Sequence, residues 1–354
     1  MRRLTGGRQA RRRMSGESTE KGGVTVIVAL LMVTLLGFVS IAVDIGVIYS
    51  ERSQLQSGAD AAAIATAQKC AKDANSEFCS TTSSLAGSLA SQNALDGMSN
   101  VHSISLDKTA RTVQVQTSAK ETGGVDNSVS LFFAGILGMP TKEVAARANA
   151  AWGSPKAGRT AFPLAFSICQ VKDNVGGSLQ LLQEHGKNAN TDCNYGPSGA
   201  AVAGGFGWLT QDTGACGGTI DLALSEGGSD PGNNAPGNCS TVLTKWASDI
   251  TAGKDVIVLL PVFNKVTGTG AGAVYGLVSF AAFKVTGWKF SGNSGLPYEF
   301  QSEKSTTTGV TTATECKGDC RGVIGSFVKY VSLADGYTLG PVDAYGATIV
   351  RLTV

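Results

Sequence analysis

The sequence is poor in charge and nearly free of histidine. Charged residues make up 16% of its 354 residues, and His102 and His185 are its two histidines. Globular chains usually carry about 25% charged residues. With 42% hydrophobic residues, this chain can bury a sizeable core, which excludes a collagen-like or polyampholyte protein, and its length suits roughly two domains.

Motifs for catalysis are missing as well. The sequence contains no G-x-S-x-G, no H-E-x-x-H and no P-loop, and neither histidine stands in a ligand-like spacing. A hydrolase needs a nucleophile, a base and an orienting acid. The glycine-rich run at residues 268–272 is not followed by Gly-Lys-Ser/Thr, so it does not predict a phosphate site. The sequence therefore predicts no enzyme, no cofactor and no metal site.

Positive charge is concentrated at the N-terminus. Residues 1–23 carry a net charge of +5, whereas the rest of the chain carries −3. The basic residues of this tail are Arg2, Arg3, Arg8, Arg11, Arg12, Arg13 and Lys21. The bulk of the chain is thus not a binder of polyanions, and no nucleic acid is expected as a partner.

A long apolar run follows this tail directly. Residues 24–43 read VTVIVALLMVTLLGFVSIAV, without charge or proline. Twenty helical residues rise about 30 Å, the thickness of the hydrocarbon core of a bilayer. The run therefore predicts a single-pass transmembrane helix. The positive-inside rule places residues 1–23 in the cytoplasm and the remainder outside the cell membrane.

Three other interpretations of this segment exist. A cleaved signal peptide has a shorter apolar region and a small-x-small cleavage site, whereas this run continues into Ala42-Val43-Asp44-Ile45. A buried core helix would not need the flanking arginines. A nucleic-acid-binding arginine tail is unnecessary, because the adjacent span already explains the basic residues.

All eight cysteines follow the apolar run: Cys70, Cys79, Cys169, Cys193, Cys216, Cys239, Cys316 and Cys320. An even number outside the membrane favours disulfides. Sequence alone leaves 105 pairings open. Sequential pairing (70–79, 169–193, 216–239, 316–320) is the expectation, because each bridge then closes a short loop. Zinc is the alternative, but the pair at 316 and 320 lacks a second ligand pair.

Three regions are expected along the chain. The apolar helix continues to about Lys72 with an Ala- and Gly-rich face that lets another helix approach closely, and a second helix is expected at 83–95. Two alternating segments at 102–106 and 112–117 predict a hairpin. A short helix at 129–137 and a strand at 144–152 complete a small β-β-α-β unit. Strands are expected in the third region at 255–263, 273–285, 323–333 and 347–354.

Further motifs lie on and around the apolar span. Lys21-Gly22-Gly23 opens the span, Asp44 and Gly46 close it, and the segment Leu55-Gln56-x-x-Ala59-Asp60-Ala-Ala62-Ala63 follows. With these motifs, residues 22–68 resemble the TadE/TadG-like, Tad-domain family of Flp/Tad pilus-assembly proteins, whose pattern here is LQ-x-x-ADAAALA. The pieces FPLA at 162–165, GGFGWL at 204–209 and GSFV at 325–328 resemble larger, cysteine-containing members of Gram-positive type.

Two features depart from related proteins. Prepilin peptidases cut after a glycine with Glu at position five of the mature chain, whereas Val28 stands five residues after Gly23. Some TadG-like proteins carry a von Willebrand A-like domain with a D-x-S-x-S metal site, and this sequence has no such motif.

The sequence as a whole predicts an α+β protein: a basic tail (1–23), a transmembrane helix (24–43), a helical stem with a pilin-like unit (44–152) and a mostly-β, disulfide-bonded extracellular domain (159–354). The resemblance implies a structural component of a Tad pilus or related secretion system. Its partners would be the membrane, other pilus-assembly proteins and a second copy bound through the Ala-rich helix. Asp44 would mark the membrane interface or pair with a partner helix. Asp60 would be either solvated or paired with a basic residue across a helix interface. The alternatives are a surface module that binds glycan or protein, and an anchored enzyme.

Overall fold

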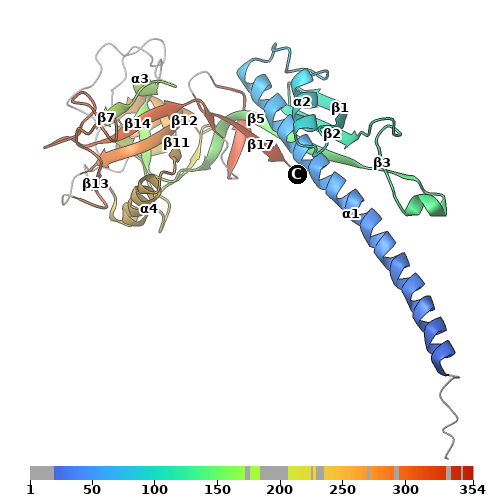
Figure 1. Cartoon of the computed structure of the whole chain (residues 1–354). Coiled ribbons are helices and arrows are strands. Elements are labelled where there is room, and N and C mark those ends of the chain that lie inside the picture. Colours follow the sequence, from blue (N-terminus) through green and yellow to red (C-terminus); the bar gives the residue numbers. More distant parts are fainter. Residues whose placement is uncertain are drawn as a thin grey trace, which may run out of the picture. The chain divides into compact units, whose positions relative to one another are not determined.

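The computed structural model describes residues 20–171, 176–183, 206–224, 226–228, 235–268, 272–290, 295–331, 336–343 and 346–353. Its first element is an uninterrupted helix, α1 (Glu20–Lys72), drawn in blue in Figure 1. Because no proline interrupts its 53 residues, every internal N–H can pair four residues back. The expected continuation of the apolar run into a long helix is therefore confirmed.

Two compact units divide the chain. The first contains the described residues up to Gly58 together with Ala90–His102 and Thr117–Ala146. The second contains Ala59–Leu89, Ser103–Gln116 and Arg147–Val354, as far as they are described. Five elements contribute residues to both units: helices α1 and α2 (Ser84–Gln92) and strands β1 (Ser99–Asp107), β2 (Thr112–Ala119) and β5 (Ala145–Arg159).

The first unit packs a short apolar cluster around α1. Leu55 of α1 is buried with Ala119, Val129, Val144 and Ala146. The strands here are β1 (Ser99–Asp107), β2 (Thr112–Ala119), β3 (Ser128–Ser130), β4 (Thr141–Glu143) and β5 (Ala145–Arg159). Strands β3 and β4 pair antiparallel, and a 3₁₀ turn, η1 (Ala134–Leu137), lies in the loop between them. The helix expected at 129–137 is thus a strand followed by this short turn.

A seven-stranded sheet has the order β1-β2-β5-β17-β15, and β9 and β16 also pair with β5. Its later strands are β9 (Thr219–Asp221), β15 (Tyr330–Val331), β16 (Tyr337–Gly340) and β17 (Thr348–Thr353). Strand β5 pairs with β17 through residues 149–153 and with β16 through residues 154–158. The strand expected at 144–152 therefore continues through residues 153–158.

An eight-stranded sheet forms the core of the second unit, with the order β7-β14-β12-β11-β6-β8 and with β10 and β13 on β12. Its strands are β6 (Leu164–Ser167), β7 (Gln180–Gln183), β8 (Phe206–Trp208), β10 (Glu226–Gly228), β11 (Val256–Thr267), β12 (Val274–Lys289), β13 (Glu299–Phe300) and β14 (Gly322–Val328). The helices are α2 (Ser84–Gln92), α3 (Ile168–Val171), η3 (Gly237–Cys239) and α4 (Ser240–Thr251).

Aromatic side chains fill this core. Phe162 lies 5.1 Å from Trp246 of α4 and 5.7 Å from Phe290, measured between ring centroids. Phe166 and Phe283 are also fully buried, with centroids 5.5 Å apart. Such pairs add stability beyond their buried area. The expected α+β fold, with a long apolar helix, a mostly-β domain and disulfides, is confirmed.

Candidate functional site

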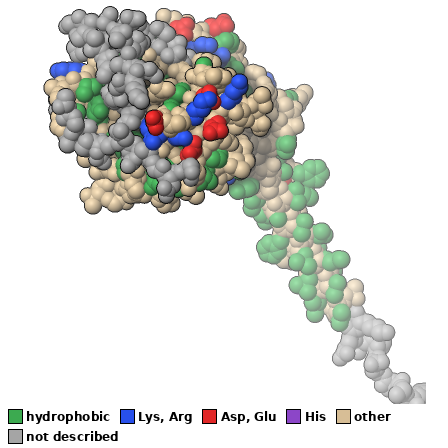
Figure 2. Space-filling view, turned by 90° about the vertical axis from the view of Figure 1, so that its left-hand side faces the viewer, with side chains coloured by type: hydrophobic (Ala, Val, Ile, Leu, Met, Phe, Trp, Pro, Cys, Tyr) green, Lys and Arg blue, Asp and Glu red, His purple; other side chains and the backbone are tan. Residues whose placement is uncertain are grey.

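The first half of α1 has an apolar surface that no part of the described chain covers. None of the side chains at residues 23–43 is buried, and Figure 2 shows hydrophobic side chains along the exposed helix. By length and composition this is a helix that could cross a membrane, and it is the one such helix among the described residues. Leu36 is 65% exposed and Val33 is 70% exposed.

The second half of α1 has the opposite character. Leu55 is 1% exposed, and Ala59, Ala62, Ala63 and Ala67 are fully buried. A Cβ added to Gly58 would lie 3.2 Å from both Cα and O of Ala90, so glycine permits a close approach. The small residues of the face that was expected to receive another helix are thus buried within their own chain.

Asp44 is buried where the apolar run ends. It is 6% exposed, and its carboxylate accepts hydrogen bonds from the backbone N–H groups of Phe132, Phe133 and Ala134, with the shortest at 2.6 Å. Charge-assisted bonds of this kind are about twice as strong as neutral ones. The carboxylate thus binds main-chain donors of its own chain, near the start of η1.

The other motif residues are distributed around the helix. Gly23 and Gly46 have open space where a Cβ would stand. Gln56 is exposed and Asp60 is half-buried. Gly22 is helical. The residues of the family pattern therefore divide between the buried face and the exposed surface of α1.

Glu51, in the first unit, has an environment that disfavours its charged form. Burial raises the pKa of Glu51 on α1, and the negative charges of Asp96 and Glu121 raise it further. Glu121 itself accepts hydrogen bonds from the backbone N–H and the hydroxyl of Ser130. Negative charges close to a carboxyl group disfavour its ionisation, and this is the effect of Asp96 and Glu121 on Glu51. This group of carboxylates could not be predicted from the sequence, because its members lie far apart along the chain.

Three of the sequentially predicted cysteine pairs are disulfides in the structure: Cys70–Cys79, Cys216–Cys239 and Cys316–Cys320. For the fourth pair, Cys193 lies outside the described residues. The bridges close loops of 9, 23 and 4 residues in sequence separation. They restrain the unfolded chain only locally, because loop entropy grows with the length of the closed loop.

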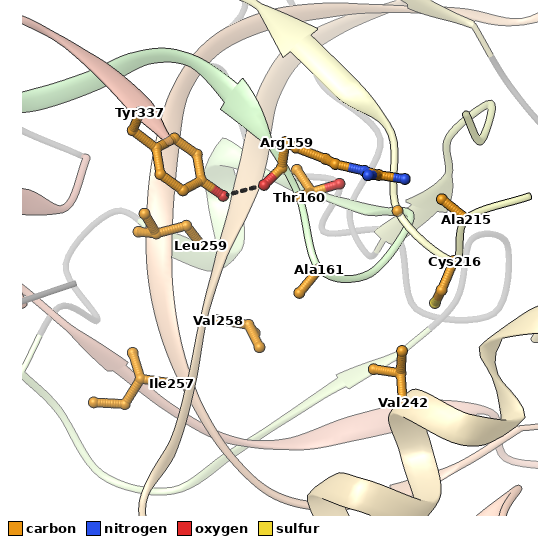
Figure 3. Close-up of a pocket in the computed structure, with 11 residues that line it drawn as sticks. Arg159, Thr160, Ala161, Ala215, Cys216, Val242, Ile257, Val258, Leu259 and Tyr337 are labelled. Atoms are coloured by element: carbon orange, nitrogen blue, oxygen red, sulfur yellow. Dashed lines mark hydrogen bonds between the residues drawn. The ribbon is translucent and has the colours of Figure 1, made fainter. Parts of the chain in front are cut away.

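A pocket of about 490 Å³ lies in the second unit. Ala161, Val242, Val258 and Leu259 supply much of its apolar lining, and Figure 3 shows these side chains below Arg159 and Tyr337. Packing shapes its wall at Gly217, where an added Cβ would lie 1.6 Å from the carbonyl oxygen of Thr160. Only glycine fits this approach.

The polar groups of the pocket already have partners. The Tyr337 hydroxyl donates a hydrogen bond of 2.7 Å to the carbonyl oxygen of Arg159 (Figure 3), and burial raises the pKa of Tyr337 to about 12. The Arg159 side chain lies 3.4 Å from the carboxylate of Asp212. The hydrogen bonds that Thr219 donates to this carboxylate, first of all from its backbone, lower the pKa of Asp212. A pocket lined by apolar side chains and one arginine is typical of a site that binds a small ligand. Arginine stays protonated, so this lining is not typical of a site for proton transfer.

Metal and acid–base sites have little support in the described chain. No group of three or more His, Cys, Asp or Glu side chains that could hold a metal occurs among the described residues. His102 is exposed on β1, and His185 lies outside the described residues.

Comparison with known proteins finds one similarity, which falls on α1. Residues 22–69 match the Tad family model, whose description reads "Putative Flp pilus-assembly TadE/G-like". No curated protein and no solved structure matches the chain. The matched residues include the exposed apolar run, Asp44 and the buried small-residue face. Residues 22–69 are therefore similar to the Tad segment of TadE/G-like proteins, which is the resemblance that the sequence motifs predicted.

Proposed function

We propose that this protein is a membrane-anchored structural component of a Flp/Tad pilus-assembly or related secretion system, acting through protein–protein contacts. The observation that carries this proposal is the coincidence on one helix of the Tad match and an uncovered apolar surface. An apolar surface of this length is stable only in lipid or against other apolar helices. Catalysis has no part in this function.

The proposed orientation rests on charge and disulfides. The net charge of +5 in residues 1–23 favours a cytoplasmic N-terminus by the positive-inside rule. The disulfides follow the span, and disulfides persist in oxidising compartments. Residues 44–354 would therefore lie outside the membrane, where they can contact other pilus-assembly proteins.

The proposed mechanism divides the work along α1. Its small-residue face packs inside the chain. The side chains at residues 24–43 remain for lipid and for the spans of partner proteins. One helix would thus anchor the protein through its first half and pack against its own chain through its second half.

Topology and piliation test the proposal together in the native host. A membrane-impermeant maleimide should label the native cysteines of intact cells only after reduction, whereas Ser15→Cys in the basic tail should react only after lysis. Deletion of the gene should abolish or shorten pili, and the full chain should restore them. Normal pili in the deletion strain, or labelling of Ser15→Cys in intact cells, would contradict the proposal.

The pocket beside Arg159 favours a second candidate, a surface-anchored module that binds glycan or protein. Its lining combines an arginine with apolar side chains, the mixture that ligand sites use. Glycan-array binding by the full chain in nanodiscs tests this candidate. Binding that Arg159→Ala removes would support it, and normal piliation in an Arg159→Ala strain would separate such a module from the assembly role.

A further inference from the structure

The loop between β3 and β4, residues 131–140 (LFFAGILGMP), exposes an unusual amount of apolar surface. Phe132 is 80% exposed, Ile136 83%, Leu137 75% and Met139 60%. None of its ten residues is charged. A contiguous apolar patch without charge marks a surface that another apolar phase or molecule covers. We refer to residues 131–140 as the hairpin tip.

The hairpin tip is tied to α1 where the apolar run ends. Asp44, the first charged residue after residues 24–43, accepts the hydrogen bonds from Phe132, Phe133 and Ala134 described above. Leu131, at the base of the tip, packs against the buried cluster around Leu55, as Ile48 of α1 also does. The tip therefore has one side fixed on the helix and the other side exposed.

These contacts set the depth of the tip along the helix axis. Its backbone is within hydrogen-bond distance of a side chain one residue beyond the apolar run. A bilayer that holds residues 24–43 therefore brings its headgroup region to the level of Asp44, within a side chain's length of Phe132. The composition of the tip suits that depth, because an uncharged segment with aromatic and aliphatic side chains can enter the interfacial region of a bilayer.

The hydrogen bonds to Asp44 also lower the free-energy cost of moving the backbone of the tip from water into the lipid interface. The first N–H groups of a helical turn have no partner within the turn. Unpaired backbone groups are costly away from water. Here the carboxylate occupies these donors, and the N–H of Met139 donates to the carbonyl oxygen of Ala134 at 3.0 Å. The backbone of the tip is thus substantially paired before it meets lipid.

We propose that the hairpin tip is a second membrane contact, whose exposed side chains insert into the lipid interface beside the exit of α1, with Asp44 as the residue that positions it. This inference rests on the proposed anchoring by residues 24–43. In this proposal Asp44 holds the backbone of the hairpin tip of its own chain, and it does not pair with a partner helix. A second contact with the bilayer beside the point where α1 leaves it would resist tilting of this helix in the membrane.

Spin-label accessibility in nanodiscs tests the proposal on the full chain with its native disulfides intact. Nitroxides are placed by Leu36→Cys in the span, by Ile136→Cys in the tip and by Leu95→Cys as a matched control. Leu95 is 88% exposed, and its backbone N–H is bound to Gln54 of α1, about 15 Å of helix rise beyond Asp44. It is thus equally exposed but farther from the bilayer.

The expected result is a severalfold higher ratio of oxygen to nickel-chelate collisions at Ile136→Cys than at Leu95→Cys, approaching that at Leu36→Cys. A water-like ratio at Ile136→Cys with a lipid-like ratio at Leu36→Cys would overturn the tip contact and leave the anchor intact. Water-like ratios at both positions would overturn the anchor itself. Low collision rates with both reagents at Ile136→Cys, with spin–spin broadening, would instead show a second copy covering the tip.

Substitution of Asp44 tests its positioning role. Asp44→Ala should return the Ile136→Cys label to a water-like ratio with increased mobility, while the Leu36→Cys label stays lipid-like. Asp44→Asn keeps one acceptor oxygen and should retain part of the effect. An unchanged Ile136→Cys ratio in Asp44→Ala would show that Asp44 does not position the tip.

Discussion

The two halves of α1 use apolar side chains in opposite ways. At residues 24–43 the large side chains of Val, Ile, Leu and Phe are exposed, whereas beyond Leu55 the small side chains of Ala59, Ala62 and Ala63 are fully buried. A soluble protein buries large apolar side chains first. The comparison shows that one continuous helix has two kinds of surface: its large apolar residues are exposed, and its small ones are buried within its own chain. The exposed large residues are the ones that the proposed anchoring would place in lipid.

The largest expected effect comes from placing charge in the first half. Val33→Arg combined with Leu35→Arg should prevent stable insertion, because each arginine near the centre of a span costs about 3 kcal/mol. Carbonate extraction of membranes measures this directly, and the variant should move from the pellet to the soluble or degraded fraction.

The matched control places two arginines in the second half. Ser53 and Gln56 are exposed, so Ser53→Arg with Gln56→Arg should leave the protein in the carbonate-resistant pellet. Equal loss from the pellet in both double variants would show that the two halves do not differ in environment.

The same enlargement in the two halves should have opposite outcomes. Ala63→Leu inserts three carbons where the side chain is fully buried, and overpacking of this kind costs about 1–3 kcal/mol. Ala42→Leu makes the same change on the exposed surface and should leave stability unchanged. Thermal unfolding in detergent, followed by circular dichroism, compares the two variants, and equal melting temperatures would contradict the assigned burial.

A smaller difference is expected at two glycines. Gly→Ala within a helix stabilises by about 0.5–1 kcal/mol when space allows. Gly46 has nothing within 4 Å of a new Cβ, whereas at Gly58 that atom would lie 3.2 Å from the backbone of Ala90. Gly46→Ala should therefore raise the melting temperature and Gly58→Ala should give less or none of that gain. A larger gain at Gly58 than at Gly46 would show that α2 yields easily.

The sequence predicts this helix well because its signals are local. Twenty uncharged residues, the absence of proline and the spacing around Leu55 lie within one continuous segment. Helix α4 was missed, although Leu243, Trp246, Ala247 and Ile250 follow the spacing of one helix face and join the core. The sequence pattern predicts only strands in this region, because the segments rich in Val, Ile and Phe give the stronger local signal.

The contacts of Asp44 were not predictable in the same way. Its partners are backbone N–H groups 88 to 90 residues away. Nearly every residue type has a backbone N–H, so the sequence does not identify which residues donate. The pairing of β5 with β16 and β17 is similarly non-local. The sequence shows that the hairpin tip is an apolar segment. It does not show which of its side chains are exposed, because that depends on the hydrogen bonds that fix its backbone to Asp44.

The smallest effect is expected at Glu51, where the second half of α1 meets other carboxylates. Burial, Asp96 and Glu121 raise the pKa of Glu51 above its ordinary value of 4.5, so the folded protein holds this proton more tightly than the unfolded chain. The stability that the protonated form contributes is fully present below about pH 4 and is lost as the pH rises through the folded pKa. Glu51→Gln should therefore stabilise the protein slightly at pH 7, and that gain should vanish at pH 4.

Chemical denaturation of Glu51→Gln at both pH values measures this difference, with Glu143→Gln on the exposed part of β4 as the matched control. Solvent screening limits the gain, because the Glu51 side chain is only partly buried. A gain at pH 7 that persists at pH 4 would point to better packing of the amide rather than to relief of charge. A loss at pH 7 would mean that the Glu51 carboxylate has a stabilising partner, and that this half of the helix gains stability from charge as well as from small-residue packing.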